Sequence, residues 1–510
     1  MLVRPAHGRV AFLLGVAAGL WGSLVAWHYH RLGLTLSHYD ARGHLVVARR
    51  IVDSITPGWQ QIGAVWLPLP HLLNAIPVQI NALYRTGASA VVISIASFAV
   101  ASAAISWLVA LLTGSVAAGA VSAVVFAANP NVLYLQATPM TEPLLCGLLA
   151  AAVALLVAWI QREATPRAIP PGFVGLALAL ACLTRYEAWP VTAGAVLCAP
   201  WARWRAGDGL SATLRRTGAI ALYPAVAIGA FLVFSRIVVG HWFVSDGFFV
   251  PENTALGRPV LAVDEIVWGV RALSGYVLVG IGVVGLAALV ALGLLDRRRG
   301  EALVAATLVA TAAVPWLAFM KGHPYRIRYM VPLILAEAVA AGAAAGYSKR
   351  ARPVVIAVLA LAAIVDLRPL DLQAPMVVEA QWDQPNIAGR RPVGDYLRAH
   401  YDGTTIMASM GSLGHYMQEL SRDGFDLRDF LHEGNGDIWL AAVVSPRPFA
   451  GWLLIEEKAE GGDELAAAAR ERPAFLEGFS RVAEGAGLAL YRRVASSEVT
   501  PQNFTAIVAR

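Results

Sequence analysis

Long apolar segments dominate the first three quarters of the chain. A helix that crosses a lipid bilayer needs about 20 mostly apolar residues, and eleven segments come near that length. They predict eleven membrane-spanning helices, among which the third, fifth and sixth are short. The segments are 10–29, 88–112, 114–130, 143–160, 171–185, 188–202, 217–239, 266–295, 301–319, 328–347 and 353–367.

The first segment also has features of a signal peptide, because Arg4 and Arg9 precede an apolar run from Val10 to Trp27. The run is long for a signal peptide, and no convincing cleavage site of small residues follows it. We therefore interpret it as an uncleaved first span.

Basic residues between the spans predict the orientation. With eleven spans, every basic cluster lies on one side, and the positive-inside rule makes that side cytoplasmic. The N-terminus is then inside and the C-terminus outside. The clusters are Arg4/Arg9, Arg162/Arg167, Arg203/Arg205/Arg215/Arg216, Arg297/Arg298/Arg299 and Lys349/Arg350/Arg352. The outer side receives the loops 30–87, 129–143, 240–264 and 321–328, and the tail after Asp366.

That tail has a different pattern from the rest of the chain. Short strand-like runs at 404–409, 452–456 and 488–491 alternate with helical runs at 395–400 and 463–470. This alternation predicts a small α/β domain. We expect two domains: a transmembrane domain, 1–367, which includes the outer loop 30–87, and a non-cytoplasmic domain, 368–510.

Composition agrees with a membrane protein. Hydrophobic residues make up 57% of the chain and charged residues 15%, whereas soluble domains carry about 25% charged residues. The net charge of +6 is modest, and its clusters lie between spans, so nucleic-acid binding is not expected. The three cysteines lie in or beside apolar spans and have no metal-binding spacing.

The first outer loop combines ionisable and apolar residues. Residues 39–51 predict an amphipathic helix in the plane of the membrane, on which Asp40 and His44 are one turn apart and share a face. A second piece, 65–73, begins with proline-stiffened turns and becomes apolar, with Trp66 at headgroup depth. An acid at the membrane rim is a functional-site hypothesis by default.

An outer loop that carries two in-plane helices and an early aspartate resembles the GT-C superfamily of polytopic glycosyltransferases, in layout over about residues 10–350. This superfamily includes protein O-mannosyltransferases, lipid A aminoarabinose transferases and oligosaccharyltransferases. The chain departs from the Asp-Glu pair of the mannosyltransferases, because Ala41 follows Asp40. The motifs that carry the resemblance are Tyr39–Arg50, Pro57–Gly63, Trp66–His71, Pro139–Leu144, Leu183–Trp189 and His323–Tyr329.

The resemblance implies an α-helical GT-C fold in the bacterial plasma (inner) membrane. It also implies a sugar donor carried on a polyprenyl phosphate and an acceptor (protein, lipid or glycan) on the outer face. Asp40 would act as the base in an inverting transfer or orient the acceptor nucleophile. The alternative is that Asp40 only caps its helix, since aspartate is favoured at helix N-termini.

Glu142 is the second acid assigned to the active site. It precedes Pro143 at the outer start of a span, so a helix-start acid is the alternative. Together with Asp40 and His44 it would complete an oxygen and nitrogen site for a divalent metal, Mg²⁺ or Mn²⁺. The alternative for His44, and for His38, is a polar contact in the loop.

Several residues are assigned to the lipid phosphate and the sugar. The positive-inside rule disfavours basic residues on the outer side, so their presence there calls for a specific role. Phosphate binding is such a role, because arginine binds phosphate bidentately. The alternatives are snorkelling to headgroups and, for Arg185, a pair with Glu187. The assigned residues are Arg185, Glu187, Lys321, His323, Tyr325, Arg326, Arg328, His44 and Tyr39.

Two other classes compete with an enzyme. A transporter or lipid flippase keeps charges near the membrane midplane, whereas we expect the mid-span positions of this chain to be free of charge. A membrane-anchored binding protein would use the tail as its working part. The sequence Gly280–Gly285 matches G-x-G-x-x-G, but it lies inside an apolar span, so it predicts helix packing and not nucleotide binding.

Overall fold

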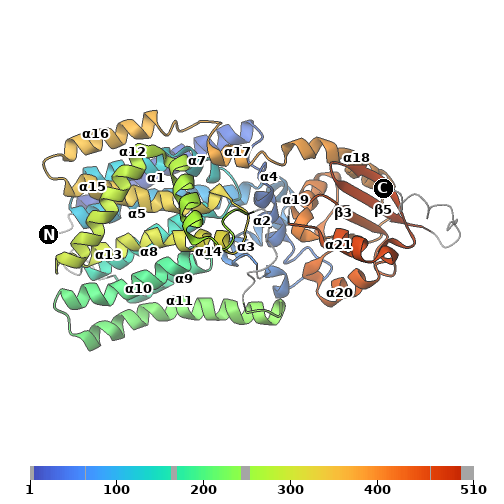
Figure 1. The fold of residues 1–510 in the computed structure, drawn as a ribbon, viewed down its shortest axis with the longest axis horizontal. Coiled ribbons are helices and arrows are strands. Elements are labelled where there is room, and N and C mark those ends of the chain that lie inside the picture. Colours follow the sequence, from blue (N-terminus) through green and yellow to red (C-terminus); the bar gives the residue numbers. More distant parts are fainter. Residues whose placement is uncertain (1–4, 64, 162–168, 243–252, 460, 495–510) are drawn as a thin grey trace. The chain divides into compact units, whose positions relative to one another are not determined.

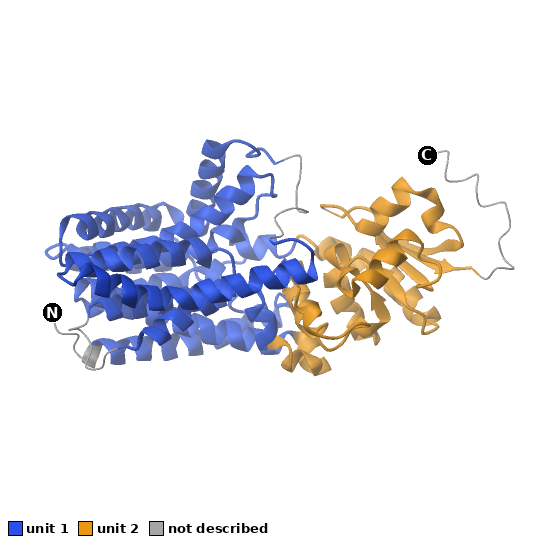
Figure 2. Cartoon of the chain, turned by 90° about the horizontal axis from the view of Figure 1, so that it is seen from below, with its two compact units in different colours: residues 1–38, 64–73, 87–381 blue, residues 39–63, 74–86, 382–510 orange. Residues whose placement is uncertain are grey.

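The computed structural model describes residues 5–63, 65–161, 169–242, 253–459 and 461–494. Arg162, Arg167 and residues 243–252 of the third predicted outer loop lie outside the described residues. The chain forms two compact units, drawn in blue and orange in Figure 2. Unit 1 comprises residues 1–38, 64–73 and 87–381, and unit 2 comprises residues 39–63, 74–86 and 382–510.

Unit 1 consists of helices, labelled in Figure 1. Within the described residues, seven helical stretches are long and apolar enough to cross a membrane, and α6, α9 and α16 are shorter apolar helices. Each of the eleven predicted spans coincides with one of the following: α1 (Pro5–Arg31), α5 (Ala88–Thr113), α6 (Val116–Ala128), α8 (Glu142–Ile160), α9 (Pro171–Cys182), α10 (Ala188–Arg205), α11 (Leu210–Val238), α12 (Pro259–Leu295), α13 (Glu301–Ala306) with η4 (Thr307–Ala312) and α14 (Ala313–Met320), η5 (Ile327–Met330) with α15 (Val331–Tyr347), and α16 (Arg352–Val365).

Side-chain amides fix two short helices of unit 1, α7 (Pro130–Leu135) and α17 (Pro375–Glu379). A third short helix is α3 (Leu69–Asn74). Asn129 caps α7 by accepting the backbone N–H of Asn131 at 3.0 Å. The Asn131 amide donates to the Leu273 carbonyl of α12 at 3.0 Å and accepts the Met376 N–H of α17 at 3.0 Å. One buried asparagine therefore joins α7, α12 and α17.

The glycines of α12 allow close helix packing. A Cβ at Gly285 would collide with the carbonyl oxygen of Ala340 in α15, and a Cβ at Gly282 would lie 3.0 Å from Cγ of Glu337. The prediction that Gly280–Gly285 serves helix packing is therefore confirmed. Gly275 interrupts the same helix with a φ of 79°, a value that favours glycine.

Glu337 contradicts the expectation that mid-span positions are free of charge. It lies near the middle of the stretch Ile327–Tyr347 and is buried. The stretch still has a mean hydropathy of 1.5, because one acid among many small apolar residues changes the average little. The charge argument against a transporter therefore fails here, and the preference for an enzyme has to rest on the site.

Unit 2 contains a five-stranded sheet with the order β2-β1-β3-β5-β4. Strand β1 is parallel to β2 and β3, whereas β5 is antiparallel to β3 and β4. The strands expected at 404–409, 452–456 and 488–491 are confirmed as β1, β3 and β5, but β2 and β4 were not predicted. The elements are β1 (Ile406–Ala408), β2 (Phe430–Leu431), β3 (Trp452–Glu456), β4 (Phe479–Gly485), β5 (Leu488–Arg493), α18 (Gln384–His400), α19 (Met410–Leu420), α20 (Asp437–Val444) and α21 (Glu464–Glu471).

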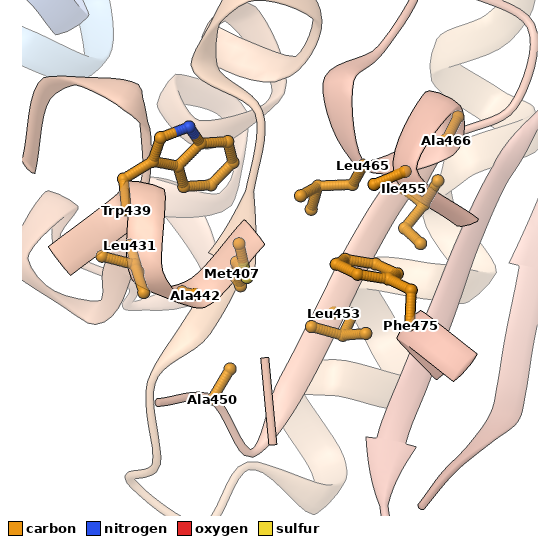
Figure 3. Close-up of a cluster of buried hydrophobic side chains, with 11 residues drawn as sticks. Met407, Leu431, Trp439, Ala442, Ala450, Leu453, Ile455, Leu465, Ala466 and Phe475 are labelled. Atoms are coloured by element: carbon orange, nitrogen blue, oxygen red, sulfur yellow. The ribbon is translucent and has the colours of Figure 1, made fainter. Parts of the chain in front are cut away.

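A buried apolar cluster holds this sheet to its helices. Met407, Leu431 and Leu453 come from three neighbouring strands, and Trp439 and Leu465 come from α20 and α21. Figure 3 shows their side chains gathered in one core. The cluster gives unit 2 its own hydrophobic core, which is what an independent domain requires.

Much of the first predicted outer loop belongs to unit 2. It forms α2 (Tyr39–Arg49), η1 (Trp59–Ile62), η2 (Pro77–Gln79) and α4 (Asn81–Thr86). The helix predicted at 39–51 is present, but α2 packs on protein, against α19, and most of its residues are buried. The two units therefore do not coincide with the predicted division at 367/368, because residues 39–63 and 74–86 cluster with the tail, and 368–381 with unit 1.

Candidate active site

Arg185 is held between two glutamates in unit 1. Its Nη1 lies 3.0 Å from Oε1 of Glu142, and its Nη2 lies 2.9 Å from Oε1 of Glu187. Nη1 also donates to the Thr141 hydroxyl at 3.0 Å. Burial lowers the pKa of Arg185, but the carboxylates of Glu142 and Glu187 raise it above its ordinary value. The pair of Arg185 with Glu187, an alternative to phosphate binding, is therefore present.

Local sequence explains how these groups meet. Glu142 is the first residue of α8, and Arg185 and Glu187 lie in the five-residue link between α9 and α10. The piece at 65–73 braces this link, because Leu69 N–H donates to Leu183 O and the Tyr186 hydroxyl donates to Val65 O, both at 3.0 Å. The ion pairs are thus set by backbone contacts on both sides.

A second set of cations lies on residues 321–328, here called the arginine turn. Lys321 directly follows α14 and is exposed, whereas Arg326 and Arg328 are buried. His323 Nε2 lies 3.3 Å from the Tyr329 hydroxyl. The Tyr325 ring packs on Phe319 and Trp268. Three positive charges therefore share one turn that aromatic rings hold in place.

His38 and Glu379 lie against the arginine turn. His38 Nε2 lies 3.1 Å from Arg328 Nη1 and 3.6 Å from Oε1 of Glu379. Glu379 Oε2 accepts the backbone N–H of Ile327 at 3.2 Å. Burial raises the pKa of Glu379, but His38, Arg328 and Arg326 together hold it below its ordinary value. Glu379 is therefore ionised at neutral pH.

The two clusters are neighbours within unit 1. The charge of Arg328 lowers the pKa of Arg185, which shows that they interact electrostatically. Glu142 and Val331, which directly follows η5, also line one small apolar pocket. Its lining residues are Phe98, Phe126, Val132, Leu135, Glu142, Pro143, Cys146 and Val331. Unit 1 thus brings the predicted residues Glu142, Arg185, Glu187, Arg326 and Arg328 into one region.

Tyr39, Asp40 and His44 lie on α2 in unit 2. Asp40 is in the first turn of α2, as the capping alternative expects, and Asp40 and His44 are buried. The Tyr39 ring lies 6.4 Å from the ring of His415 on α19. Burial and the charge of Arg42 lower the pKa of His415 to about 3, although Asp383 and Asp40 act in the opposite direction. His415, a residue of the tail, is therefore a neutral neighbour of Asp40.

The predicted metal site was assigned to Asp40, Glu142 and His44. Among the residues that the structure describes, no group of three or more His, Cys, Asp or Glu side chains is arranged to hold a metal ion. Glu142 is instead paired with Arg185. The divalent metal stays a prediction, and no step below depends on one.

Glu379 is the main residue that sequence reasoning missed. It lies on a five-residue helix after the last span, and no motif or spacing singles it out. His38 was considered only as a polar loop contact. Both gain their position from contacts with residues about 290 or 50 positions away in the chain, so only the fold could reveal them.

The fold is similar to that of two solved ArnT structures, as the resemblance to the GT-C superfamily predicts, and the predicted polytopic helical architecture with a C-terminal α/β domain is confirmed. The crystal structure of ArnT from Cupriavidus metallidurans bound to undecaprenyl phosphate matches with a TM-score of 0.59 and 13% identity, over 95% of this chain and 98% of that one. ArnT in the apo state matches with a TM-score of 0.58 and 12% identity, over 94% and 98%.

At such low identity this likeness establishes the fold alone. An archaeal oligosaccharyltransferase, from Archaeoglobus fulgidus, matches less closely, with a TM-score of 0.48 and 12% identity over 89% of this chain and 72% of that one. No family model and no curated protein sequence matches the chain.

Proposed function

We propose that this protein is a membrane glycosyltransferase that moves a sugar from a polyprenyl-phosphate donor to an acceptor. The observation that carries the proposal is the buried pair Arg326 and Arg328 on one turn, in a fold shared with a protein crystallised with undecaprenyl phosphate. Buried arginines near a lipid-facing bundle suit a lipid phosphate, because a guanidinium binds phosphate bidentately and is always charged.

In the proposed reaction, Asp40 removes a proton from the acceptor nucleophile as that atom attacks the anomeric carbon of the sugar. The bond between that carbon and the phosphate oxygen breaks, and the polyprenyl phosphate leaves with the bonding electrons. Attack on the face opposite the phosphate inverts the anomeric carbon. Arg326 and Arg328 stabilise the negative charge that develops on the leaving phosphate.

Arg185 has a different proposed role. Because Glu142 and Glu187 both pair with it, its charge is already balanced within the protein. We assign it to holding Glu142 at the start of α8, close to the arginine turn. Lys321, His323 and Tyr325 are proposed to contact the phosphate or the sugar from the same turn.

We propose the bacterial inner membrane as the location, with the N-terminus in the cytoplasm and unit 2 outside. A transporter is the competing class, and the buried Glu337 is the observation that favours it. Glycosyl transfer is preferred because the cations and acids gather at the arginine turn.

The test is Asp40→Asn in the purified full-length protein, given a panel of undecaprenyl-phosphate sugars and acceptors. We expect turnover to fall by about 10²- to 10⁴-fold, the usual contribution of a general base, while undecaprenyl phosphate still binds. Asp437→Asn is the matched control, because Asp437 is also an acid in a first helical turn but is exposed.

Other results would overturn the proposal. Unchanged turnover in Asp40→Asn would remove its role as a base. A loss confined to thermal stability, as from the control, would leave only the helix cap. If no lipid-linked sugar were turned over by the wild type, and liposomes showed Glu337-dependent substrate flux, the protein would be a transporter.

A further inference from the structure

We infer that Glu379 is a positioning residue that sets the geometry of the arginine turn for a phosphate. This inference rests on the proposed function and deepens it. Glu379 itself would not touch the donor. It would act through the backbone N–H of Ile327, which its carboxylate accepts, and it lies beside His38, which contacts Arg328.

The first link is to the backbone. Glu379 Oε2 accepts the N–H of Ile327 at 3.2 Å, between Arg326 and Arg328 in sequence. An ionised carboxylate makes a stronger hydrogen bond to such a donor than a neutral group. This contact fixes the backbone at the point from which both arginine side chains leave.

The second link is to a side chain. His38 Nε2 lies 3.1 Å from Arg328 Nη1 and 3.6 Å from Oε1 of Glu379. The Glu379 carboxylate therefore lies beside the contact between His38 and Arg328. His38 is fully buried, and its orientation therefore sets where the Arg328 guanidinium lies.

The helix that carries Glu379 is itself anchored. A five-residue helix is not stable alone, and α17 is held by the Met376 N–H on Asn131 Oδ1. Asn131 also donates to the Leu273 carbonyl of α12. A rigid chain of hydrogen bonds therefore runs from the bundle to the arginine turn.

Because Glu379 is negatively charged, the direction of the change in phosphate affinity on its removal tests the inference. A carboxylate near the arginines repels an incoming phosphate, so its removal would tighten phosphate binding if charge were all that mattered. If Glu379 positions the turn, its removal weakens binding despite the relief of repulsion. Glu379→Gln keeps the shape of the side chain and removes its charge.

The experiment measures binding of undecaprenyl phosphate to the full-length protein in nanodiscs, with neutral undecaprenol as the baseline. We expect Glu379→Gln to weaken binding about tenfold, with the KM for the donor rising and kcat changing less than threefold. The binding affinity of Glu379→Asp, which keeps the charge, should lie between those of the wild type and Glu379→Gln. Glu477→Gln, at an exposed glutamate of unit 2, is the control and should bind like wild type.

A second variant covers the case in which Glu379→Gln does not fold. His38→Ala should weaken binding by a similar factor, and the double variant should lose less than the sum of both changes, because the two residues act through one contact. Equal or tighter binding in Glu379→Gln or His38→Ala would overturn this inference alone. Failure of the wild type to prefer the phosphate over undecaprenol would instead overturn the proposed function.

Discussion

Both units contain a cluster of buried arginines, but the clusters differ in their partners. In unit 2, Arg42 lies 3.2 Å from Asp383 and 3.1 Å from Glu419, and Arg390 makes two contacts with Asp383, at 2.9 and 2.7 Å. These ion pairs fasten α2, from the first loop, to α18 and α19. Their charges are satisfied inside the unit.

The arginine turn of unit 1 is built differently. Arg328 contacts His38 and lies in the field of the Glu379 carboxylate, while Lys321 on the same turn is exposed. Arg185 nearby resembles the unit 2 cluster, since two glutamates hold it. Burial of an arginine is therefore not by itself a sign of phosphate binding, and the nature of its partners carries the information.

The largest effects should come from removing one buried arginine from each cluster. The loss in unit 2 should be one of stability, and the loss in unit 1 should be one of phosphate binding. Arg42→Met removes one of the two arginines that contact Asp383 and the arginine 3.1 Å from Glu419, which should cost about 1–3 kcal/mol of stability. Thermal unfolding or limited proteolysis of unit 2 would measure it. Arg328→Met should instead weaken undecaprenyl phosphate binding at least tenfold, with a smaller loss of stability.

A reversed result would break the comparison. If Arg42→Met lost phosphate binding while unit 2 stayed stable, the functional cluster would be in unit 2. If Arg328→Met only destabilised the protein, the arginine turn would be structural, like the unit 2 cluster.

Acid should destabilise unit 2 through His415. Its folded pKa of about 3 lies below its ordinary value of about 6.5, so below pH 6.5 the unfolded chain binds a proton that the folded unit does not. Stability should fall by about 2 kcal/mol between pH 6.5 and 5, and not change from this residue above pH 6.5. Asp383, Arg42, Arg390 and Asp40 are the charged groups around it.

The measurement is the melting temperature of wild type and His415→Gln at pH 7.5 and 5.0. The variant should lose less stability on acidification. The lowered pKa of the buried His432 acts in the same direction, so part of the fall should remain. An equally large fall in melting temperature in both proteins would show that His415 is protonated in the folded unit as readily as in the unfolded chain.

The smallest effect should come from an exposed arginine in the same unit. Asp53 accepts from Arg49 Nε at 2.7 Å and from Arg428 Nε at 2.9 Å, but Arg428 is mostly exposed. Arg428→Ala should therefore cost only about 0–1 kcal/mol. Arg49→Met, at a buried partner of the same carboxylate, should cost clearly more in the same thermal assay, and equal losses would contradict the role given to burial.

The sequence alone was sufficient for features that depend on neighbouring residues. Each of the eleven apolar segments forms helix because a span must satisfy its own backbone hydrogen bonds. The helix at Tyr39–Arg49, with Asp40 and His44 one turn apart, and the strand Trp452–Glu456 are local patterns of the same kind. Motif resemblance also predicted the fold, and it singled out Glu142, Arg185 and Arg328, which lie in one region of unit 1.

Only the tertiary structure decided which charges meet. Glu379 reaches Ile327 and His38, and Arg42 reaches Asp383, across 52, 341 and 341 positions of chain. The mean hydropathy of its span gave no sign of the buried acid Glu337. Buried ion pairs also connect much of the first loop to the rest of unit 2. Charge pairing depends on distance in space and on burial, and neither is encoded in local spacing.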